Sequence, residues 1–177
     1  DRAVCSVVLL KSPRIVARSR PAKVGTFELG AHLQEKLIGV GLKPDNKVEL
    51  FERIAEKFLL ACPTAHKDEV VMALVNREAA QNTGVCQGVA MPHATLPDIH
   101  ETFLVIEVLS EPLDYDAPDN EPVDVIFATL GPPTHRDTHL NLLGALSRMV
   151  LRPDFLDTLR GKKAPSQIVE LISECQQ

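Results

Sequence analysis

The sequence has 177 residues, of which 45% are hydrophobic and 24% charged, as is typical of a domain that buries an apolar core. Its formal net charge of −5 at pH 7 disfavours nucleic acid as a partner, because a phosphate backbone needs a basic face. No apolar run approaches the roughly 20 residues of a membrane-spanning helix. The four cysteines are scattered and form no CxxC pair, which favours a reducing, cytoplasmic location.

Residues 1–26 differ in character from the rest of the chain. They are predicted to form a linker or the tail of a longer protein, with an N-terminal edge strand at residues 5–10 as the alternative. A basic, proline-containing stretch follows that strand and would suit a position beside a membrane surface. We therefore place the folded domain at residues 27–177 and keep a covalent link to an upstream membrane protein as one option.

Three helices are predicted next, because apolar residues recur there every three to four positions. Their ranges are 27–40, 47–62 and 64–81. Asn46 precedes the second helix with Glu49 three residues on, a variant of the capping box that marks a helix start. Pro63 has no backbone N–H with which to continue a helix, so the second helix is expected to end there.

Arg77 lies near the end of the third predicted helix, three residues beyond Leu74 and seven beyond Val70. This spacing places it on the apolar stripe of that helix. Such an arginine can complement the negative end of the helix dipole while its stem packs on the core. It can also clamp an anion, because its forked donors match a phosphate. The residues alone leave both roles open.

After residue 82 the sequence contains two closely spaced glycines, followed by segments rich in β-branched and aliphatic residues. Strands are predicted at residues 89–91, 102–109, 113–115 and 123–130, and helices at 134–151, 154–160 and 166–175. Helices thus precede, separate and follow the strands. This order predicts an α/β fold, an α+β sandwich in which helices cover both faces of a mixed β-sheet.

His93 is the histidine with the most informative surroundings. It follows Pro92 directly after a predicted strand, and Gly84 and Gly88 lie just upstream. The proline ends the strand and stiffens the approach to the ring, and the glycines allow backbone to pass close beside it. These features suit a fixed nucleophilic imidazole at the end of a sheet. They suit equally a histidine that caps a turn.

His139 lies near the start of the helix predicted at 134–151, close to the positive end of its dipole, where a negative ligand is favoured. The alternative is an exposed histidine in the first turns of a helix. No pair among the six histidines has the HExxH spacing of a zinc site, and His135 with His139 would supply only two ligands. We therefore predict no metal site.

Five short motifs follow one another along the chain. They are Asn76-Arg77-Glu78, Asn82-Thr83-Gly84, Gly88-Val89-Ala90-Met91-Pro92-His93-Ala94, Pro122-Val123-Asp124-Val125-Ile126-Phe127 and Thr138-His139-Leu140. Together they resemble the enzyme IIA domains of the fructose/mannitol and nitrogen-regulatory phosphotransferase systems, over residues 28–175. Met91 departs mildly from that pattern, because a branched aliphatic residue is usual at its place.

The resemblance implies a mixed sheet between helices and a phosphotransferase that works without a cofactor. In this family a histidine accepts a phosphoryl group, ultimately from phosphoenolpyruvate, through an HPr-type carrier protein. The group then passes to an enzyme IIB domain or serves as a signal to a regulated target protein. Matched residue by residue, the motifs imply that His93 is phosphorylated, that His139 is the second histidine of the site and that Arg77 is the arginine beside it.

Two other functions remain open at this stage. The first is a non-catalytic regulatory module of the same fold, attached to a membrane transporter, which the basic stretch within residues 1–26 motivates. The second is a metal-dependent hydrolase built on the histidines, for which stoichiometric bound metal would be the evidence.

Overall fold

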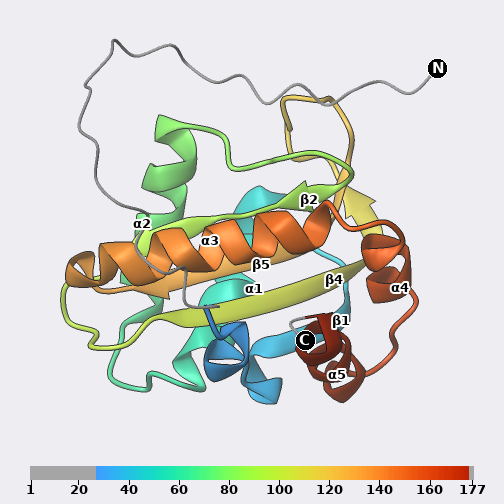
Figure 1. The fold of residues 1–177 in the computed structure, drawn as a ribbon. Coiled ribbons are helices and arrows are strands. Elements are labelled where there is room, and N and C mark those ends of the chain that lie inside the picture. The colour runs from blue at the N-terminus through green and yellow to red at the C-terminus, as the bar shows by residue number, and fades with distance from the viewer. Residues whose placement is uncertain (1–26, 176–177) are drawn as a thin grey trace, which may run out of the picture.

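The computed structural model describes residues 27–175, so the predictions for residues 1–26 lie outside the described part of the chain. Its sheet runs in the order β1 (Ile38–Leu42), β4 (Phe103–Leu113), β5 (Val123–Gly131) and β2 (Val89–Ala90), with β3 (His93–Thr95) also paired to β5. Strands β4 and β5 are antiparallel, and every other pairing is parallel. The sheet is therefore mixed, as the sequence predicted (Figure 1).

Within residues 27–175, five α-helices cover the two faces of this sheet. They are α1 (Lys47–Leu59), α2 (Lys67–Ala80), α3 (Arg136–Val150), α4 (Phe155–Arg160) and α5 (Pro165–Cys175). Figure 1 shows α3 in front of the sheet and α1 behind it. No helix within residues 27–175 combines the length and the apolar character needed to cross a membrane.

Alternation along β5 divides the interior into two cores. Ile126, Ala128 and Leu130 pack with the apolar faces of α1 and α2, whereas Val125 and Phe127 pack with α3, α4 and α5. Successive side chains of a strand point to opposite faces, so one buried strand supplies both cores. The predicted fold class, with helices on both faces of a mixed sheet, is confirmed.

The helix predicted over residues 27–40 is wrong. The structure has two short 3₁₀ turns there, Leu29–His32 and Glu35–Leu37, followed by strand β1. The apolar residues Leu29 and Leu37 of this segment are nevertheless fully buried. Glycine is a poor helix former, and pairing β1 with β4 buries this segment as a strand instead.

Two other predictions change in detail. The separate strand predicted at 113–115 is wrong, because β4 continues to Leu113. His93 is the first residue of β3 rather than a residue that follows the strand predicted at 89–91. Pro92 lacks an N–H and divides one extended segment into β2 and β3.

The start of α1 is built as predicted. Asn46 accepts a hydrogen bond from the Glu49 backbone N–H at 3.0 Å. The Glu49 carboxylate accepts in turn from the backbone N–H of Asp45 at 2.8 Å. The first bond satisfies an N–H that the first turn of the helix leaves unpaired, and the second holds the residue before the cap.

Strand β1 also makes room for a buried charge. Glu107 on β4 is 2% exposed and lies opposite Gly39 in the register of β1. Its Oε1 is 3.2 Å from Nζ of Lys57 on α1. Burial raises the pKa of Glu107, and the charge of Lys57 opposes that rise. A Cβ on Gly39 would lie 2.0 Å from Glu107 Oε2 and 2.7 Å from Lys57 Nζ, so the ion pair in its present position leaves no room for a side chain there.

We expect Gly39→Ala to lower the free energy of unfolding by about 1–3 kcal/mol, because the added methyl forces the buried pair apart. Gly144→Ala is the matched control: its Cβ in α3 would meet only Arg148 Nη1, at 3.4 Å. That change is expected to stabilise the helix by about 0.5–1 kcal/mol. Urea titrations of both variants measure the difference, and a Gly39→Ala protein as stable as Gly144→Ala would contradict it.

Candidate functional site

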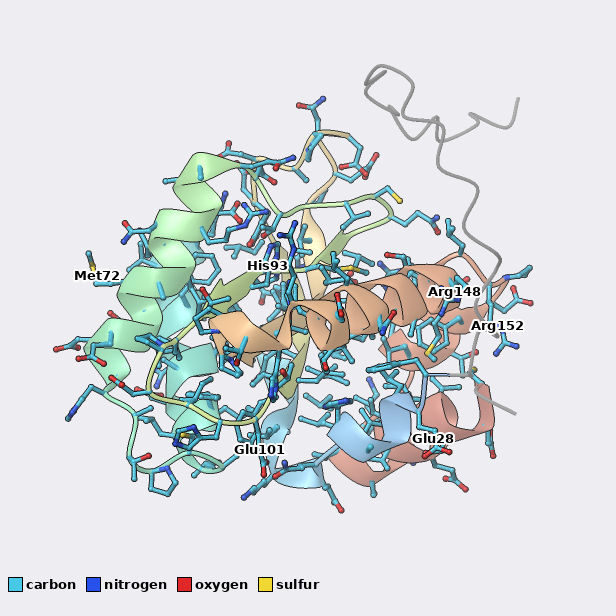
Figure 2. The ribbon with its side chains drawn as sticks, turned by 60° about the vertical axis from the view of Figure 1, so that its left-hand side comes forward. Glu28, Met72, His93, Glu101, Arg148 and Arg152 are labelled. Atoms are coloured by element: carbon cyan, nitrogen blue, oxygen red, sulfur yellow. The ribbon has the colours of Figure 1, made fainter. Side chains whose placement is uncertain are left out.

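Arg77, His93 and His139 converge on one place, although different layers of the fold carry them. Arg77 comes from α2, His93 from the short strand β3 and His139 from the first turns of α3. Figure 2 shows His93 between α2 and α3. Ala94 faces the core under α1 and α2, so alternation turns His93 toward the α3 side. The structure thus brings together all three residues that the sequence singled out.

The hydrogen bonds of His93 define which ring nitrogen is basic. Nδ1 lies 3.1 Å from the carbonyl oxygen of Met91, and a carbonyl only accepts, so Nδ1 carries the proton. Nε2 lies 2.9 Å from Nε of Arg77, whose N–H can only donate. The neutral ring therefore holds its lone pair on Nε2. Burial lowers the pKa of His93, and the nearby Arg77 charge lowers it further.

Arg77 is positioned at both ends of its guanidinium. Besides donating to His93, its Nη1 donates to the carbonyl oxygen of Gln81 at 3.0 Å. Gln81 is the C-terminal cap residue of α2, so the arginine also satisfies a carbonyl at the helix end. Of the two roles that the sequence left open, this contact shows the end-of-helix cation, and the anion clamp stays a prediction.

His139 faces His93 across a short gap. The two ring centroids are 4.8 Å apart and the rings are tilted by 47°. The His139 Nδ1 lies 3.2 Å from the hydroxyl oxygen of Thr129 on β5. Thr129 is the residue that pairs with His93 in the register of β3 and β5. Burial, followed by the charges of His93 and Arg77, lowers the pKa of His139 to about 4. The site is therefore a cation beside two neutral imidazoles.

A largely buried carboxylate anchors the end of α2, where Arg77 lies. Glu78, next to Arg77 on α2, accepts hydrogen bonds through Oε2 from the backbone N–H and hydroxyl of Thr83 and from the Tyr115 hydroxyl. Its Oε1 forms an ion pair with Lys47 at 3.1 Å, and the Lys47 ammonium lies 4.3 Å from the centre of the Tyr115 ring. This network ties the end of α2 to α1 and to the segment before β2.

The segment before β2 is held from the other side by α4. Arg160 donates from Nε and Nη2 to the two carboxylate oxygens of Asp124, each at 2.8 Å, and from Nη2 to the carbonyl of Gln87. Gly88 follows with φ +76°, and a Cβ there would lie 2.8 Å from both the Arg160 and Asp124 side chains. Glycine is therefore required by conformation and by space.

Sequence reasoning assigned no role to Glu78, Thr129, Asp124 or Arg160. Glu78 and Asp124 lie within two of the motifs that carry the family resemblance, and this position was the sequence feature that could have indicated a role for them. Thr129 breaks a run of apolar residues on a buried strand, and a polar residue at such a position calls for a partner. Nothing local in the sequence pairs Arg160 with Asp124, because 36 residues separate them.

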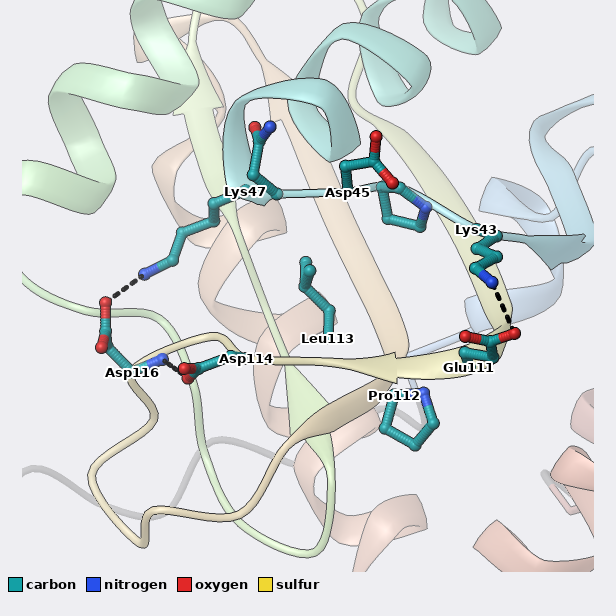
Figure 3. Close-up of a pocket in the computed structure, with 10 residues that line it drawn as sticks. Lys43, Asp45, Lys47, Glu111, Pro112, Leu113, Asp114 and Asp116 are labelled. Atoms are coloured by element: carbon teal, nitrogen blue, oxygen red, sulfur yellow. Dashed lines mark hydrogen bonds and ion pairs between the residues drawn. The ribbon is translucent and has the colours of Figure 1, made fainter.

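Two hollows in the structure lie away from these three residues. A hollow of about 490 Å³ lies between the start of α1 and the end of β4, where Lys47 reaches toward Asp116 and Lys43 pairs with Glu111 (Figure 3). A second, of about 500 Å³, lies beside β1. Neither is lined by His93. Within residues 27–175, no three histidine, cysteine or acidic side chains are grouped so as to hold a metal ion.

The site geometry predicts the ring titrations. Both imidazoles should titrate below the ordinary histidine value of about 6.5, His139 near 4, because burial and Arg77 disfavour the charged rings. Arg77→Met removes the positive charge and should raise both midpoints. Histidine Cε1–H chemical shifts followed by NMR against pH measure them.

Arg148→Met is the control for this titration, since the exposed Arg148 lies on α3 well away from His93 in Figure 2. It should leave both midpoints unchanged. A His139 midpoint at or above 6.5 in the unaltered protein, or no rise in Arg77→Met, would show that the rings are not coupled to the arginine.

Comparison with known families matches residues 31–175 to the phosphoenolpyruvate-dependent sugar phosphotransferase system, EIIA 2. The chain is 29% identical over 137 residues to the nitrogen regulatory protein of Pseudomonas aeruginosa, covering 77% of this chain and 89% of that one. It is 34% identical over 140 residues to a nitrogen regulatory protein homolog of Haemophilus influenzae, with 77% and 85% covered. The fructose-specific EIIA component of Haloferax volcanii is 27% identical over 139 residues, with 78% and 90% covered.

Solved structures show the same fold. The nitrogen regulatory protein IIA-Ntr from Neisseria meningitidis superposes with a TM-score of 0.76 at 26% identity, covering 81% of this chain and 98% of that one. Enzyme IIA mannitol of Escherichia coli, solved in complex with phosphorylated enzyme IIB mannitol, has a TM-score of 0.68 at 18% identity, with 80% and 97% covered.

Proposed function

We propose that this chain, which belongs to the phosphoenolpyruvate-dependent sugar phosphotransferase system EIIA 2 family, carries a phosphoryl group on His93. The observation that supports this role is the state of the ring: Nδ1 holds the proton against the Met91 carbonyl, and Nε2 presents its lone pair beside Arg77. A neutral imidazole with one basic nitrogen is a competent nucleophile near neutral pH.

The transfer step needs positioning and charge compensation more than further chemistry. As the bond from phosphorus to the donor nitrogen breaks, a bond from phosphorus to Nε2 of His93 forms, and Nδ1 keeps its proton. Charge on the three equatorial oxygens of this loose transition state is then stabilised by nearby donors. Arg77 and His139 are the donors we assign, because both lie beside the His93 ring.

Arg77 must move for the phosphoryl group to arrive. In the unphosphorylated structure its Nε–H occupies the Nε2 lone pair of His93, so attack requires this hydrogen bond to break. The guanidinium can then bind the phosphoryl oxygens, for which its charge and forked geometry are suited. The same side chain thus covers the nucleophile before transfer and neutralises the phosphoryl group after it.

The partners we propose are proteins. The donor is an HPr-type phosphocarrier, and the acceptor is an enzyme IIB domain or a regulated target protein. Two observations support this: His93 does not line either hollow described above, and a structural neighbour was solved with a phosphorylated enzyme IIB. The relatives named as nitrogen regulatory proteins favour use of the phosphorylation state as a signal. We assign this function to the domain at residues 27–177, without a cofactor.

Phosphorylation tests the proposal directly. Incubation with phosphoenolpyruvate, enzyme I and several HPr-type carriers should add the mass of one phosphoryl group in an acid-labile form. His93→Ala should lose the adduct completely. His139→Ala should still accept it, but pass it on more slowly by roughly one to two orders of magnitude, because a transition-state donor is lost.

His100→Ala is the matched control, since His100 is an exposed histidine outside the site. It should be phosphorylated at the normal rate. An unchanged mass with every active carrier, or an adduct that persists in His93→Ala, would overturn the proposal.

A further inference from the structure

We infer that Thr129 is a positioning residue for phosphoryl binding: its hydroxyl donates to Nδ1 of His139 and so places the proton of that ring on Nε2. This inference rests on the proposed function and deepens it, because it assigns the protonation of the second histidine to a residue of the sheet. The contact that carries it joins Thr129 Oγ1 and His139 Nδ1 at 3.2 Å.

Strand geometry puts the hydroxyl in this place. On β5, Val125 and Phe127 face the core under α3, and Thr129 continues that row two residues on. It pairs with His93 in the register between β3 and β5. Thr129 therefore lies beside the proposed phosphorylated residue in the sheet and beneath His139 of α3, where a single hydroxyl can act on the second ring.

Hydrogen-bond accounting decides which atom donates. Thr129 is 0% exposed, and every buried polar side-chain atom among the described residues has a partner. Within residues 27–175, the Thr129 hydroxyl has His139 as its one hydrogen-bond partner. If Nδ1–H donated instead, the buried hydroxyl proton would be left without an acceptor, which costs free energy. Donation by the threonine satisfies both groups.

The consequence for phosphoryl binding follows from the hydrogen-bond donors and acceptors of a neutral imidazole. A neutral imidazole has one N–H and one lone pair. With the lone pair of His139 engaged at Nδ1, Nε2–H is the group available to donate to a phosphoryl oxygen on His93. The opposite tautomer would present a lone pair to that anion and repel it. A charged ring would donate from both nitrogens, so its tautomer would be irrelevant. Because the pKa of His139 is lowered, the ring is neutral near pH 7 and the position of its one proton decides whether it can donate.

Thr129→Val tests the inference, since valine keeps the branched shape and removes the hydroxyl. Long-range ¹H–¹⁵N NMR of the unphosphorylated protein should show His139 protonated at Nε2, and Thr129→Val should show a mixture of the two neutral tautomers. At equilibrium with a phosphorylated HPr-type carrier, the phosphorylated fraction of Thr129→Val should correspond to an equilibrium constant about fivefold lower, as for one lost hydrogen bond.

Two further variants separate positioning from general packing. Thr129→Ser retains the hydroxyl and should restore both the tautomer and the equilibrium. Thr102→Val removes a comparable contact outside the site, between Thr102 Oγ1 and Nδ1 of His135 at 3.4 Å, and should change neither. Failure of Thr129→Ser to restore the equilibrium, or an equal loss in Thr102→Val, would overturn the inference.

The tautomer measurement does not depend on phosphorylation. If the unaltered protein accepts no phosphoryl group, the proposed function fails, while the ring nitrogens of His139 still decide the role of Thr129. A proton on Nδ1 of His139 in the unaltered protein would overturn the inference by itself, even if Thr129→Val did not fold.

Discussion

The hydrogen bond from Arg77 Nε to His93 Nε2 is the interaction on which the site depends. It exists only because the Met91 carbonyl holds the proton on the opposite nitrogen, which leaves a lone pair to accept it. One backbone carbonyl thus sets the direction of the ring. The bond also joins a helix of one layer to a strand at the sheet margin, so that position and protonation state are determined together.

The surroundings of this bond are organised to keep one positive charge near two neutral rings. Burial and Arg77 lower the pKa values of both His93 and His139, and Glu78 opposes the effect at His93. The Glu78 carboxylate is itself neutralised by Lys47 and held by three further donors. A buried carboxylate with this many partners stabilises its position more than it perturbs its neighbours. The positive charge of Arg77 is therefore the charge that lowers the pKa of both rings.

Glycines make the supporting contacts sterically feasible at two distant places. Gly39 leaves space for the buried Glu107–Lys57 pair that joins the sheet to α1, and Gly88 leaves space for the Arg160–Asp124 pair that joins α4 to the approach of β2. Each pair joins charges from distant parts of the chain, and Glu107 is buried, so losing its partner Lys57 would be costly. The loop that leads to His93 is held by Arg160 of α4 at Gln87 and by Glu78 of α2 at Thr83.

The sequence by itself determined the helices after residue 42, the long strands, the mixed sheet and three residues to assign to one site, because apolar periodicity and short motifs can be read from the chain alone. The helix predicted over residues 27–40 is wrong, because glycines disfavour a helix there and pairing with the distant strand β4 makes residues 38–42 a strand. Only the tertiary structure decided that His93 is a strand residue, which nitrogen of its ring is basic, and that Thr129, Glu78 and Arg160 support it. Those facts depend on contacts between residues far apart in the chain, and no local pattern encodes a hydrogen bond that the fold alone brings within reach.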